Sequence, residues 1–410
     1  MHQIMSNLID GKLVAPVGGR YLDVFEPATG AVYAACPDSD ERDVELAVQA
    51  AQRAAPAWGA TPVDARAKAI SALADAVEAQ FESFVRDESR DTGKPLTLAR
   101  EVDIYRAVAN LRFFASAITQ WHSESYADGG SLNITVRQPL GVVGCISPWN
   151  LPLYLFTWKI APALAAGNAV VAKPSEVTPY TAFRLSQLAA ECGLPPGVLN
   201  IVQGTGPRVG QPLVDHAAIK AVSFTGSTRT GAAISASAAR SFKKVSLEMG
   251  GKNPTLIFDD ADLSDEKLGT IVRSGFVNQG EICLCGSRVL VQRSIYDQFK
   301  DRYLARVKAL RVGDPQDPST DLGAIVSEQH HKKVTDSLAR ARDEGGTVLC
   351  GGDVPRVDGR CANGWFVSPT VIEGLPQACA TNREEIFGPV VTLIPFDDED
   401  EAIAMANDTN

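Results

Sequence analysis

Between residues 44 and 121, apolar side chains recur at every third or fourth position, which is the spacing of an amphipathic α-helix. Three stretches carry this spacing: VELAVQAAQRAAPAW, AKAISALADAVEAQFESFV and EVDIYRAVANLRFFASAI. The segment DTGKP separates the second stretch from the third, because glycine and proline interrupt helices. The pattern therefore predicts mostly helix from residue 44 to about residue 121, and we interpret residues 1–121 as a helical lead-in.

The period shortens to two in the segment LNITVRQPLGVVGCI, and beyond it short β-branched runs alternate with helical ones. The runs are GVVGCI, NAVVAK, VLNIV, AIKAVSFTG and KKVSLEM, followed by PTLIFDD, SRVLVQ and GTVLCGG. Strands that are separated by helices predict a parallel sheet covered on both faces. The glycine pair in EMGGKNP predicts a hinge, so we expect an α/β chain with two domains, divided near residue 248.

Composition limits the classes of function. The 410 residues are 45% hydrophobic and 21% charged, as in a soluble globular protein. The net charge of -10 argues against nucleic acid or an anionic membrane as a partner, because phosphates would be repelled. No stretch stays apolar for the roughly 18 residues of a membrane span, and the N-terminus lacks a signal-peptide pattern. Eight scattered cysteines without a CxxC pair predict reduced thiols and no metal site, so we expect a cytoplasmic protein that acts on a small molecule.

Two glycine-rich turns lie between a predicted strand and a predicted helix. The first holds Gly204, Gly206 and Gly210, and in the second Gly226 is followed by Ser227. Such turns place phosphates at a helix N-terminus, where unpaired N–H groups favour an anion. Neither turn fits the GxGxxG pattern, so ordinary chain reversal is the alternative for each.

The segment VVAKPSE places Lys173 and Glu176 at the carboxyl end of a buried strand, where open α/β sheets bind ligands. A carboxylate there can accept hydrogen bonds from a ribose diol. The alternative is that the segment only turns the chain into the next helix. Together with the two glycine turns, it favours a nucleotide site.

Two further positions offer catalytic groups. Glu248 ends a strand beside two glycines; if it is buried, its pKa would rise and suit it to act as a general base toward water. Asn150 lies between two prolines, which stiffen its backbone and fix its amide as a donor to an oxyanion, worth on the order of 3 kcal/mol. A surface glutamate and a turn asparagine are the alternatives.

Cys283 and Cys285 lie in FVNQGEICLCGSR, among glycines and polar residues and not in the apolar setting of a structural cysteine. A thiol, an oxyanion donor, a water-activating carboxylate and a dinucleotide describe the oxidation of an aldehyde through a covalent thioester. The histidines lie outside every motif, which argues against a Cys–His hydrolase: they are His2, His122, His216, His330 and His331.

The motifs SPWNLP, KPSE, FTGST, LEMGGKNP, NQGEICLCGSR and EEIFGP resemble, in order and spacing, those of the aldehyde dehydrogenase superfamily. The resemblance covers nearly the whole chain. It implies a Rossmann-type NAD-binding domain over residues 1–121 and 140–247, with residues 122–139 as an oligomerisation β-hairpin. Residues 248–410 would form an α/β catalytic domain, and the chain would assemble as a homodimer or homotetramer.

The resemblance also implies roles for single residues. Cys283, five residues before Arg288, matches the nucleophile, Glu248 the general base, and Asn150 the oxyanion donor. The positions that match NAD contacts are Ile146, Trp149, Lys173, Ser175, Glu176, Gly206, Gly210, Phe224, Gly226, Ser227, Gly250, Glu385 and Phe387. Among them Lys173 and Glu176 would contact the adenosine ribose, and Ser227 would approach the pyrophosphate. Glu385 and Phe387 would position the nicotinamide ribose and ring.

A narrower likeness concerns NQGEICLC and DIYRAVANLRFFA, which resemble the branch that oxidises 2-hydroxymuconic and 2-aminomuconic semialdehydes in aromatic catabolism. It implies an aldehyde substrate with a carboxylate, held by Arg106 in the substrate funnel. Alternatively, Arg106 is a solvated residue of an amphipathic helix. The remaining alternatives are a dehydrogenase of other or broad specificity, a CoA-acylating enzyme and a catalytically silent relative.

Members of the superfamily continue for several tens of residues beyond the position of Asn410, with segments that close the funnel and complete the oligomer. Because the sequence ends at Asn410, we do not expect these segments in the chain as given, and its activity and assembly are open at this point. We expect an exposed strand edge and a tendency to aggregate.

Overall fold

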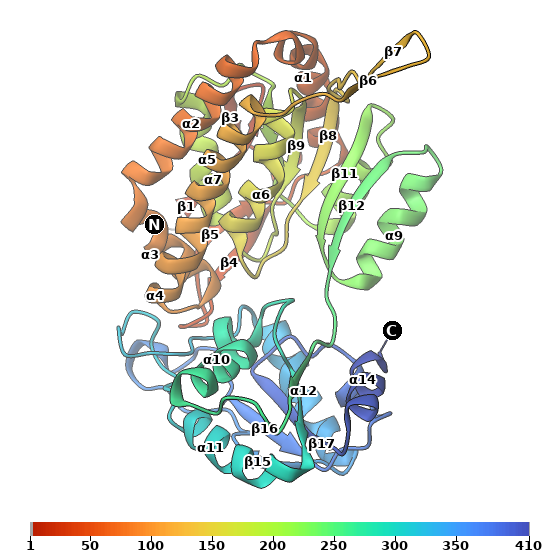
Figure 1. Cartoon of the computed structure of the whole chain (residues 1–410). Helices are drawn as coiled ribbons and strands as arrows, with labels where there is room; N and C mark the ends of the chain where they lie inside the picture. The colour runs from red at the N-terminus through yellow and green to blue at the C-terminus, as the bar shows by residue number, and fades with distance from the viewer. Residues whose placement is uncertain (1–2, 410) are drawn as a thin grey trace. The chain divides into compact units, whose positions relative to one another are not determined.

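The computed structural model describes residues 3–409 and divides into two compact units (Figure 1). The first unit consists of Met1–Val24, Val32–Asp91 and Ala99–Glu248. The second consists of Phe25–Ala31, Thr92–Leu98 and Met249–Asn410. The two short N-terminal segments of the second unit are a contribution that no sequence pattern indicated. Within residues 3–409, no helix is long and apolar enough to cross a lipid bilayer.

The first unit is built on a seven-stranded sheet with the order β12-β11-β8-β9-β10-β2-β3. Its four central strands are parallel, and β2 and β3 pair antiparallel at one side. The bounds are β2 (Asn7–Ile9), β3 (Lys12–Val14), β8 (Val142–Ile146), β9 (Ala169–Lys173), β10 (Leu199–Ile201), β11 (Ile219–Gly226) and β12 (Lys244–Met249). The predicted parallel sheet is therefore confirmed.

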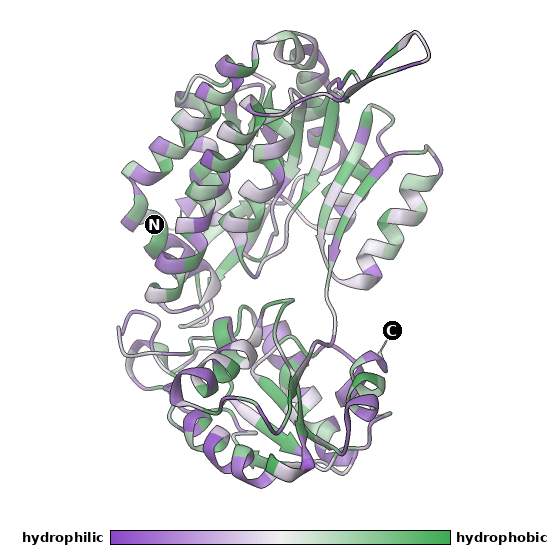
Figure 2. Cartoon of the chain, viewed as in Figure 1, coloured by the Kyte–Doolittle hydropathy of each residue, from purple (hydrophilic) through white to green (hydrophobic). Residues whose placement is uncertain are grey.

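Helices cover both faces of this sheet, because side chains along each strand alternate between them. Val142 and Ile146 of β8 pack in a core with α1, α8 and α9, whereas Val143 and Cys145 face Trp158 of α6. The helices of the unit are α1 (Glu41–Ala60), α2 (Val63–Ala79), α3 (Phe81–Thr92), η1 (Ala99–Ile104), α5 (Tyr105–Thr119), α6 (Pro152–Ala165), α7 (Tyr180–Glu191), η2 (Gly206–Gly210), α8 (Gln211–Asp215) and α9 (Thr228–Ala239). Figure 2 shows the hydrophobic strands between helices of mixed polarity.

Residues 3–37 form strands, so the helical lead-in predicted over residues 1–121 is wrong for this part. β1 (Gln3–Ile4), β5 (Ala31–Pro37) and β4 (Tyr21–Glu26) make a three-stranded sheet. The cause is tertiary: Tyr33, Ala34 and Cys36 of β5 pack in a core with the side chains of α7. Helical structure begins only at α1.

A two-stranded hairpin, β6 (Ser125–Asp128) and β7 (Ser131–Ile134), projects from the first unit (Figure 1). Gly129 and Gly130 supply the positive φ values of its turn, 51° and 95°. Every residue of both strands is exposed, including large apolar ones. The hairpin therefore has no core of its own.

The second unit is built on a five-stranded sheet with the order β13-β14-β17-β16-β15, parallel except for the antiparallel edge strand β15. Its strands are β13 (Pro254–Ile257), β14 (Arg288–Gln292), β15 (Thr347–Cys350), β16 (Thr370–Glu373) and β17 (Val390–Phe396). Two of its helices, α10 and α11, share one core with the sheet, and α12 and α14 pack in two other cores. Their bounds are α10 (Asp265–Phe276), α11 (Tyr296–Lys308), α12 (Glu328–Asp343) and α14 (Glu399–Asn407).

Candidate active site

A pocket of about 730 Å³ lies at the carboxyl ends of the central strands in the first unit. Ile146 ends β8, Lys173 ends β9 and Gly226 ends β11, and all three line it. The chain leaves β8 toward β9 on one side and returns as β11 on the other, and such a switch point is where open α/β sheets bind ligands. Its volume is in the range of small-molecule and cofactor sites.

The structure brings ten of the predicted NAD contacts to this one pocket, although they come from four separate stretches of sequence. They are Ile146, Trp149, Lys173, Ser175, Glu176, Gly206, Gly210, Phe224, Gly226 and Ser227. Arg229 and Thr230 at the start of α9 line it too, and no motif singled them out.

Lys173 and Glu176 form an ion pair at the wall of the pocket. The buried Lys173 ammonium donates to Glu176 Oε2 at 2.9 Å and to the carbonyls of Pro174 and Gly204 at 2.9 and 2.8 Å. All three N–H donors of Lys173 are thereby committed. Burial acts to raise the pKa of Glu176, but the Lys173 charge, the hydrogen bond from Lys173 and hydrogen bonds from backbone N–H groups together outweigh it, and the net shift is downward. Glu176 is thus an oriented, ionised acceptor.

The N-terminus of α9 opens into the same pocket. Ser227 is its N-cap and accepts from the Thr230 backbone N–H at 3.3 Å, which sets where the helix begins. A Cβ on Gly226 would lie 2.5 Å from the Phe224 ring, so only glycine fits there. The arrangement offers a helix N-terminus, which favours an anion such as a phosphate.

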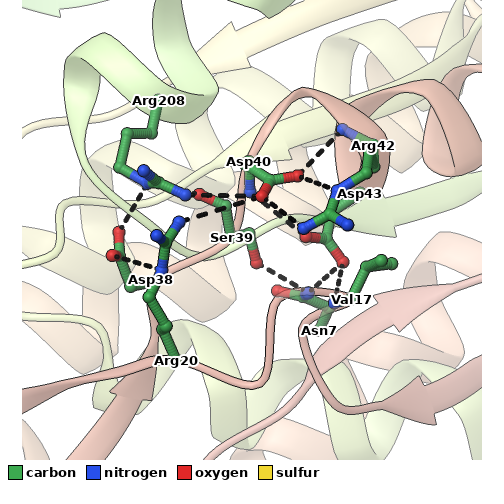
Figure 3. Close-up of polar contacts among 9 residues, drawn as sticks. All are labelled: Asn7, Val17, Arg20, Asp38, Ser39, Asp40, Arg42, Asp43 and Arg208. Atoms are coloured by element: carbon green, nitrogen blue, oxygen red, sulfur yellow. Dashed lines mark hydrogen bonds and ion pairs between the residues drawn. The ribbon is translucent and has the colours of Figure 1, made fainter.

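A polar network anchors the glycine turn on the other side of the pocket (Figure 3). Arg208, in the turn between Gly206 and Gly210, pairs with Asp38 at 3.1 Å and with Asp40 at 3.4 Å. Asp40 is also the N-cap of α1, in a capping box with Asp43. The network therefore fixes η2 to the start of α1.

Asn150 lies in the turn between β8 and α6. Its side chain is buried, and Pro152 at the first turn of α6 fixes the chain beyond it. The carbonyl of the preceding Trp149 accepts from Thr178 Oγ1 at 3.1 Å. The turn is therefore held from both sides, as a fixed amide donor requires.

Glu248 is exposed in the structure, which does not meet the condition of burial on which the expected rise of its pKa rested. The reason is its position: β12 is the edge strand of the seven-stranded sheet, so only one neighbour shields it.

A second pocket of about 430 Å³ is lined by Glu248, Cys145 and Lys159. Lys159 is buried and donates to Ser223 Oγ at 3.2 Å, and burial lowers its pKa to about 8. Lys159 belongs to none of the motifs above; its sequence signal is its place in the otherwise apolar run YLFTWKIAPALA.

Arg106 and Arg112 lie on the same helix, α5, and differ in their partners. The guanidinium of Arg112 pairs with Asp75 at 3.0 Å and with Glu78. Arg106 is exposed, lies 3.4 Å from Tyr154 Oη and stacks 5.2 Å from that ring, and it forms no ion pair within residues 3–409. Its charge is available to an anion.

In the second unit, a strained loop leads to the cysteines. Asn278, Gln279 and Gly280 have φ values of 55°, 56° and 72°, a run that non-glycine residues rarely adopt. The buried Gln279 amide holds the loop by donating to the Ala324 carbonyl at 3.3 Å and accepting from Gly323 N–H at 3.2 Å. The loop is thus fixed by residues about 45 positions further along the chain.

Cys283 and Cys285 have different environments. Cys285 is buried, and burial raises the pKa of its thiol to about 12, whereas Cys283 is only partly buried. The Asn253 side-chain amide donates to both carbonyls, at 2.6 Å to Cys283 and 3.2 Å to Cys285. Of the two thiols, Cys283 is the one that a substrate can reach.

The loops before β13, β14 and β17 meet at one edge of the second sheet, because these three strands are adjacent and parallel. They carry Gly250, Cys283, and Glu385 with Phe387. Glu385 accepts from Gly251 N–H at 3.4 Å, and a Cβ on Gly250 would collide with its carboxylate. Burial raises the pKa of Glu385. The structure therefore brings together the predicted site residues of this unit.

Comparison with known proteins gives a family match and close relatives. The aldehyde dehydrogenase family matches residues 14–410. A 2-aminomuconic semialdehyde dehydrogenase from Danio rerio is 49% identical over 408 residues, 98% of this chain and 83% of that protein. A 2-hydroxymuconic semialdehyde dehydrogenase from a Pseudomonas species is 43% identical over 410 residues, 98% of this chain and 84% of that protein.

Solved structures agree. A putative aldehyde dehydrogenase from Burkholderia cenocepacia matches with a TM-score of 0.96 at 42% identity, covering 100% of this chain and 83% of that one. Betaine aldehyde dehydrogenase from Staphylococcus aureus, in complex with NAD+, matches with a TM-score of 0.95 at 36% identity, covering 100% and 81%.

Proposed function

Because this chain belongs to the aldehyde dehydrogenase family, we propose that it oxidises an aldehyde that carries a carboxylate, of the muconic semialdehyde type, to the acid with NAD. The family match confirms the resemblance predicted from the motifs, the α/β fold and the class of enzyme, an NAD-dependent aldehyde dehydrogenase. The substrate and the roles of single residues are the proposal.

The observation that carries the proposal is the convergence of ten predicted contacts on one pocket. Glu176, oriented by Lys173, accepts hydrogen bonds from the hydroxyls of the adenosine ribose. The α9 N-terminus at Ser227 receives the pyrophosphate. Glu385 and Phe387 hold the nicotinamide ribose and ring. Bound there, NAD supplies the hydride acceptor.

Cys283 is the nucleophile. Its sulfur adds to the aldehyde carbon, and the amide of Asn150 with the Cys283 backbone N–H stabilises the oxyanion. After loss of hydride the acyl group remains on Cys283 as a thioester. Glu248 takes a proton from the water that hydrolyses this thioester and releases the acid. Cys283 is only partly buried whereas Cys285 is buried, which supports this choice of thiol.

The two relatives described above support the substrate class, since they are muconic semialdehyde dehydrogenases that are 49% and 43% identical to this chain. Arg106 supports it from the structure, because its guanidinium is exposed and forms no ion pair with any described residue. Such a group can hold a carboxylate in a bidentate pair and so orient the aldehyde.

A direct experiment tests the reaction class. The purified protein is incubated with NAD and a muconic semialdehyde, with and without CoA, and NADH and products are measured. NADH formation with free acid as the product, independent of CoA, is expected. An acyl-CoA product would identify a CoA-acylating enzyme instead. No NADH would contradict the proposed substrate and leave a dehydrogenase of other specificity or a catalytically silent relative.

We also propose that the β6–β7 hairpin pairs with a second copy of the chain in a homodimer or homotetramer. Tyr126, Leu132 and Ile134 are each about two-thirds exposed on it, which favours burial against a partner. A stable monomer in light scattering would contradict this.

A cytoplasmic location fits the eight cysteines of the described chain, none of which forms a disulfide.

A further inference from the structure

His330 lies on α12 with its imidazole directed at the loop that carries Phe387. Nε2 is 2.6 Å from the Phe387 carbonyl oxygen, a short hydrogen bond, and the two rings meet edge to face with centroids 6.0 Å apart. The side chain is only 11% exposed. The contact is therefore sheltered from water, where a hydrogen bond is costly to break.

Phe387 has a φ of 62°, which is strained for an aromatic residue and costs about 1–3 kcal/mol. Such a conformation persists only where the surroundings enforce it. One turn after His330 on α12, Val334 lies so close to Gly388 that any side chain there would collide with it. A Cβ on Gly280, in the loop that leads to the cysteines, would collide with the Gly388 carbonyl oxygen. Within this packing, His330 holds the carbonyl of Phe387 through its hydrogen bond.

The protonation of His330 is defined by its surroundings. A carbonyl oxygen only accepts, so Nε2 carries the hydrogen. Burial lowers the pKa of His330 to about 4, so the ring is neutral near pH 7. Nε2 also lies 3.9 Å from Glu281 Oε1, beyond hydrogen-bond distance, and that carboxyl accepts from Val326 N–H at 3.1 Å. The Nε2 hydrogen is thus directed to Phe387.

We propose that His330 is a positioning residue for cofactor binding: by holding the Phe387 carbonyl, it fixes the aromatic ring that receives the nicotinamide. This inference rests on the proposed function, which assigns Phe387 that contact. His330 itself touches no reacting atom. Its effect is on the geometry of the loop over residues 385–388, and hence on NAD binding more than on the chemistry at Cys283.

Three variants of the chain test the inference. His330→Leu keeps the approximate size and removes the donor, whereas His330→Gln keeps an N–H at similar reach. His331→Leu is the matched control, because the neighbouring His331 makes the same kind of bond, 3.0 Å from Nε2 to the Phe366 carbonyl, away from the site. NAD binding is measured by titration calorimetry, with KM and kcat from steady-state assays and melting temperatures for each variant.

For His330→Leu we expect about tenfold weaker NAD binding and a KM for NAD raised by the same factor, with kcat at saturating NAD changed less. His330→Gln should recover most of the affinity, and His331→Leu should bind NAD as the wild type does. NAD binding that is unchanged in His330→Leu, or as weak in His330→Gln as in His330→Leu, would overturn this inference but not the proposed function. A wild-type chain that bound no NAD would overturn the proposed function as well.

Discussion

Lys173 uses all three of its N–H donors inside the protein, one of them on Glu176 Oε2 at 2.9 Å. The lysine therefore orients the Glu176 carboxylate and favours its ionised form. Glu176 is the group at the pocket wall that meets the ribose in our proposal. Its pKa is lowered, because the Lys173 charge and the hydrogen bonds to the carboxylate together outweigh burial. In that proposal, the negative charge of Glu176 repels the 2′-phosphate of NADP and so favours NAD.

The first prediction concerns that discrimination. Glu176→Gln should reduce the preference for NAD over NADP by about tenfold in kcat/KM, because repulsion of the 2′-phosphate is removed. Glu191→Gln, at the exposed end of α7 and outside the pocket, is the control and should keep the wild-type ratio. Equal kcat/KM for NAD and NADP in the wild type would refute the role of Glu176.

The second prediction separates the two half-reactions. Glu248→Gln should still release NADH in the first turnover, since addition of Cys283 to the aldehyde does not require activation of water. Steady-state turnover should fall roughly 100-fold or more, which is the usual contribution of a general base. Rapid mixing with NAD and aldehyde would then show a burst followed by a nearly flat line. Wild-type turnover in this variant would exclude Glu248 as the base.

The third prediction tests the substrate class through two arginines of one helix. Arg106→Ala should lower kcat/KM for a muconic semialdehyde, with a loss of transition-state stabilisation of roughly 2–3 kcal/mol. The kcat/KM for a neutral aldehyde of similar length should change little. Arg112→Ala should spare both substrates, because that guanidinium is already paired with Asp75 and Glu78. An equal loss for the charged and the neutral aldehyde in Arg106→Ala would end the assignment.

The fourth prediction concerns stability and pH. Asp91 is fully buried, where it accepts from Tyr33 Oη at 2.5 Å and from Tyr180 N–H at 2.9 Å. Burial raises the pKa of Asp91 from 3.8 to about 7 in the folded chain. The folded state therefore binds the extra proton, so the contribution of Asp91 to stability is full below pH 3.8 and is lost as the pH rises through 7.

The measurement is the urea midpoint of wild type and Asp91→Asn between about pH 5.5 and 7.5. We expect the free energy of unfolding of the wild type to fall by roughly 2 kcal/mol relative to the variant as the pH rises across this interval. The reason is that the side-chain amide of the Asp91→Asn variant cannot ionise. A difference between the two proteins that stays constant with pH, or that grows in favour of the wild type, would contradict the raised pKa.

The sequence predicted the parts of this protein that depend on local pattern. The strands that end at Ile146, Lys173 and Gly226 are short β-branched runs, and their carboxyl ends are where topology puts a ligand. Once those strands are parallel neighbours, the residues that follow them must gather at one edge. Local pattern therefore indicated Lys173, Glu176 and the two glycine turns. The resemblance to the family implied the other pocket contacts, such as Ile146 and Trp149.

The sequence could not predict contacts between distant segments. His330 meets Phe387 57 residues away, and Asn253 meets Cys283 30 residues away, and neither pair carries a local signal. For the same reason the strands within residues 3–37 were missed, since their packing partners lie in α7. The exposure of Glu248 follows from the place of β12 at the sheet edge, which only the strand order reveals.

The central claim is that Cys283 forms the covalent bond to the aldehyde, and the neighbouring thiol gives it a matched control. Cys285 is buried with its pKa raised to about 12, so Cys285→Ala should keep the NADH burst, whereas Cys283→Ala should lose it. The measurement is the burst amplitude per active chain after rapid mixing with NAD and a muconic semialdehyde. A burst that survives in Cys283→Ala and disappears in Cys285→Ala would contradict the claim.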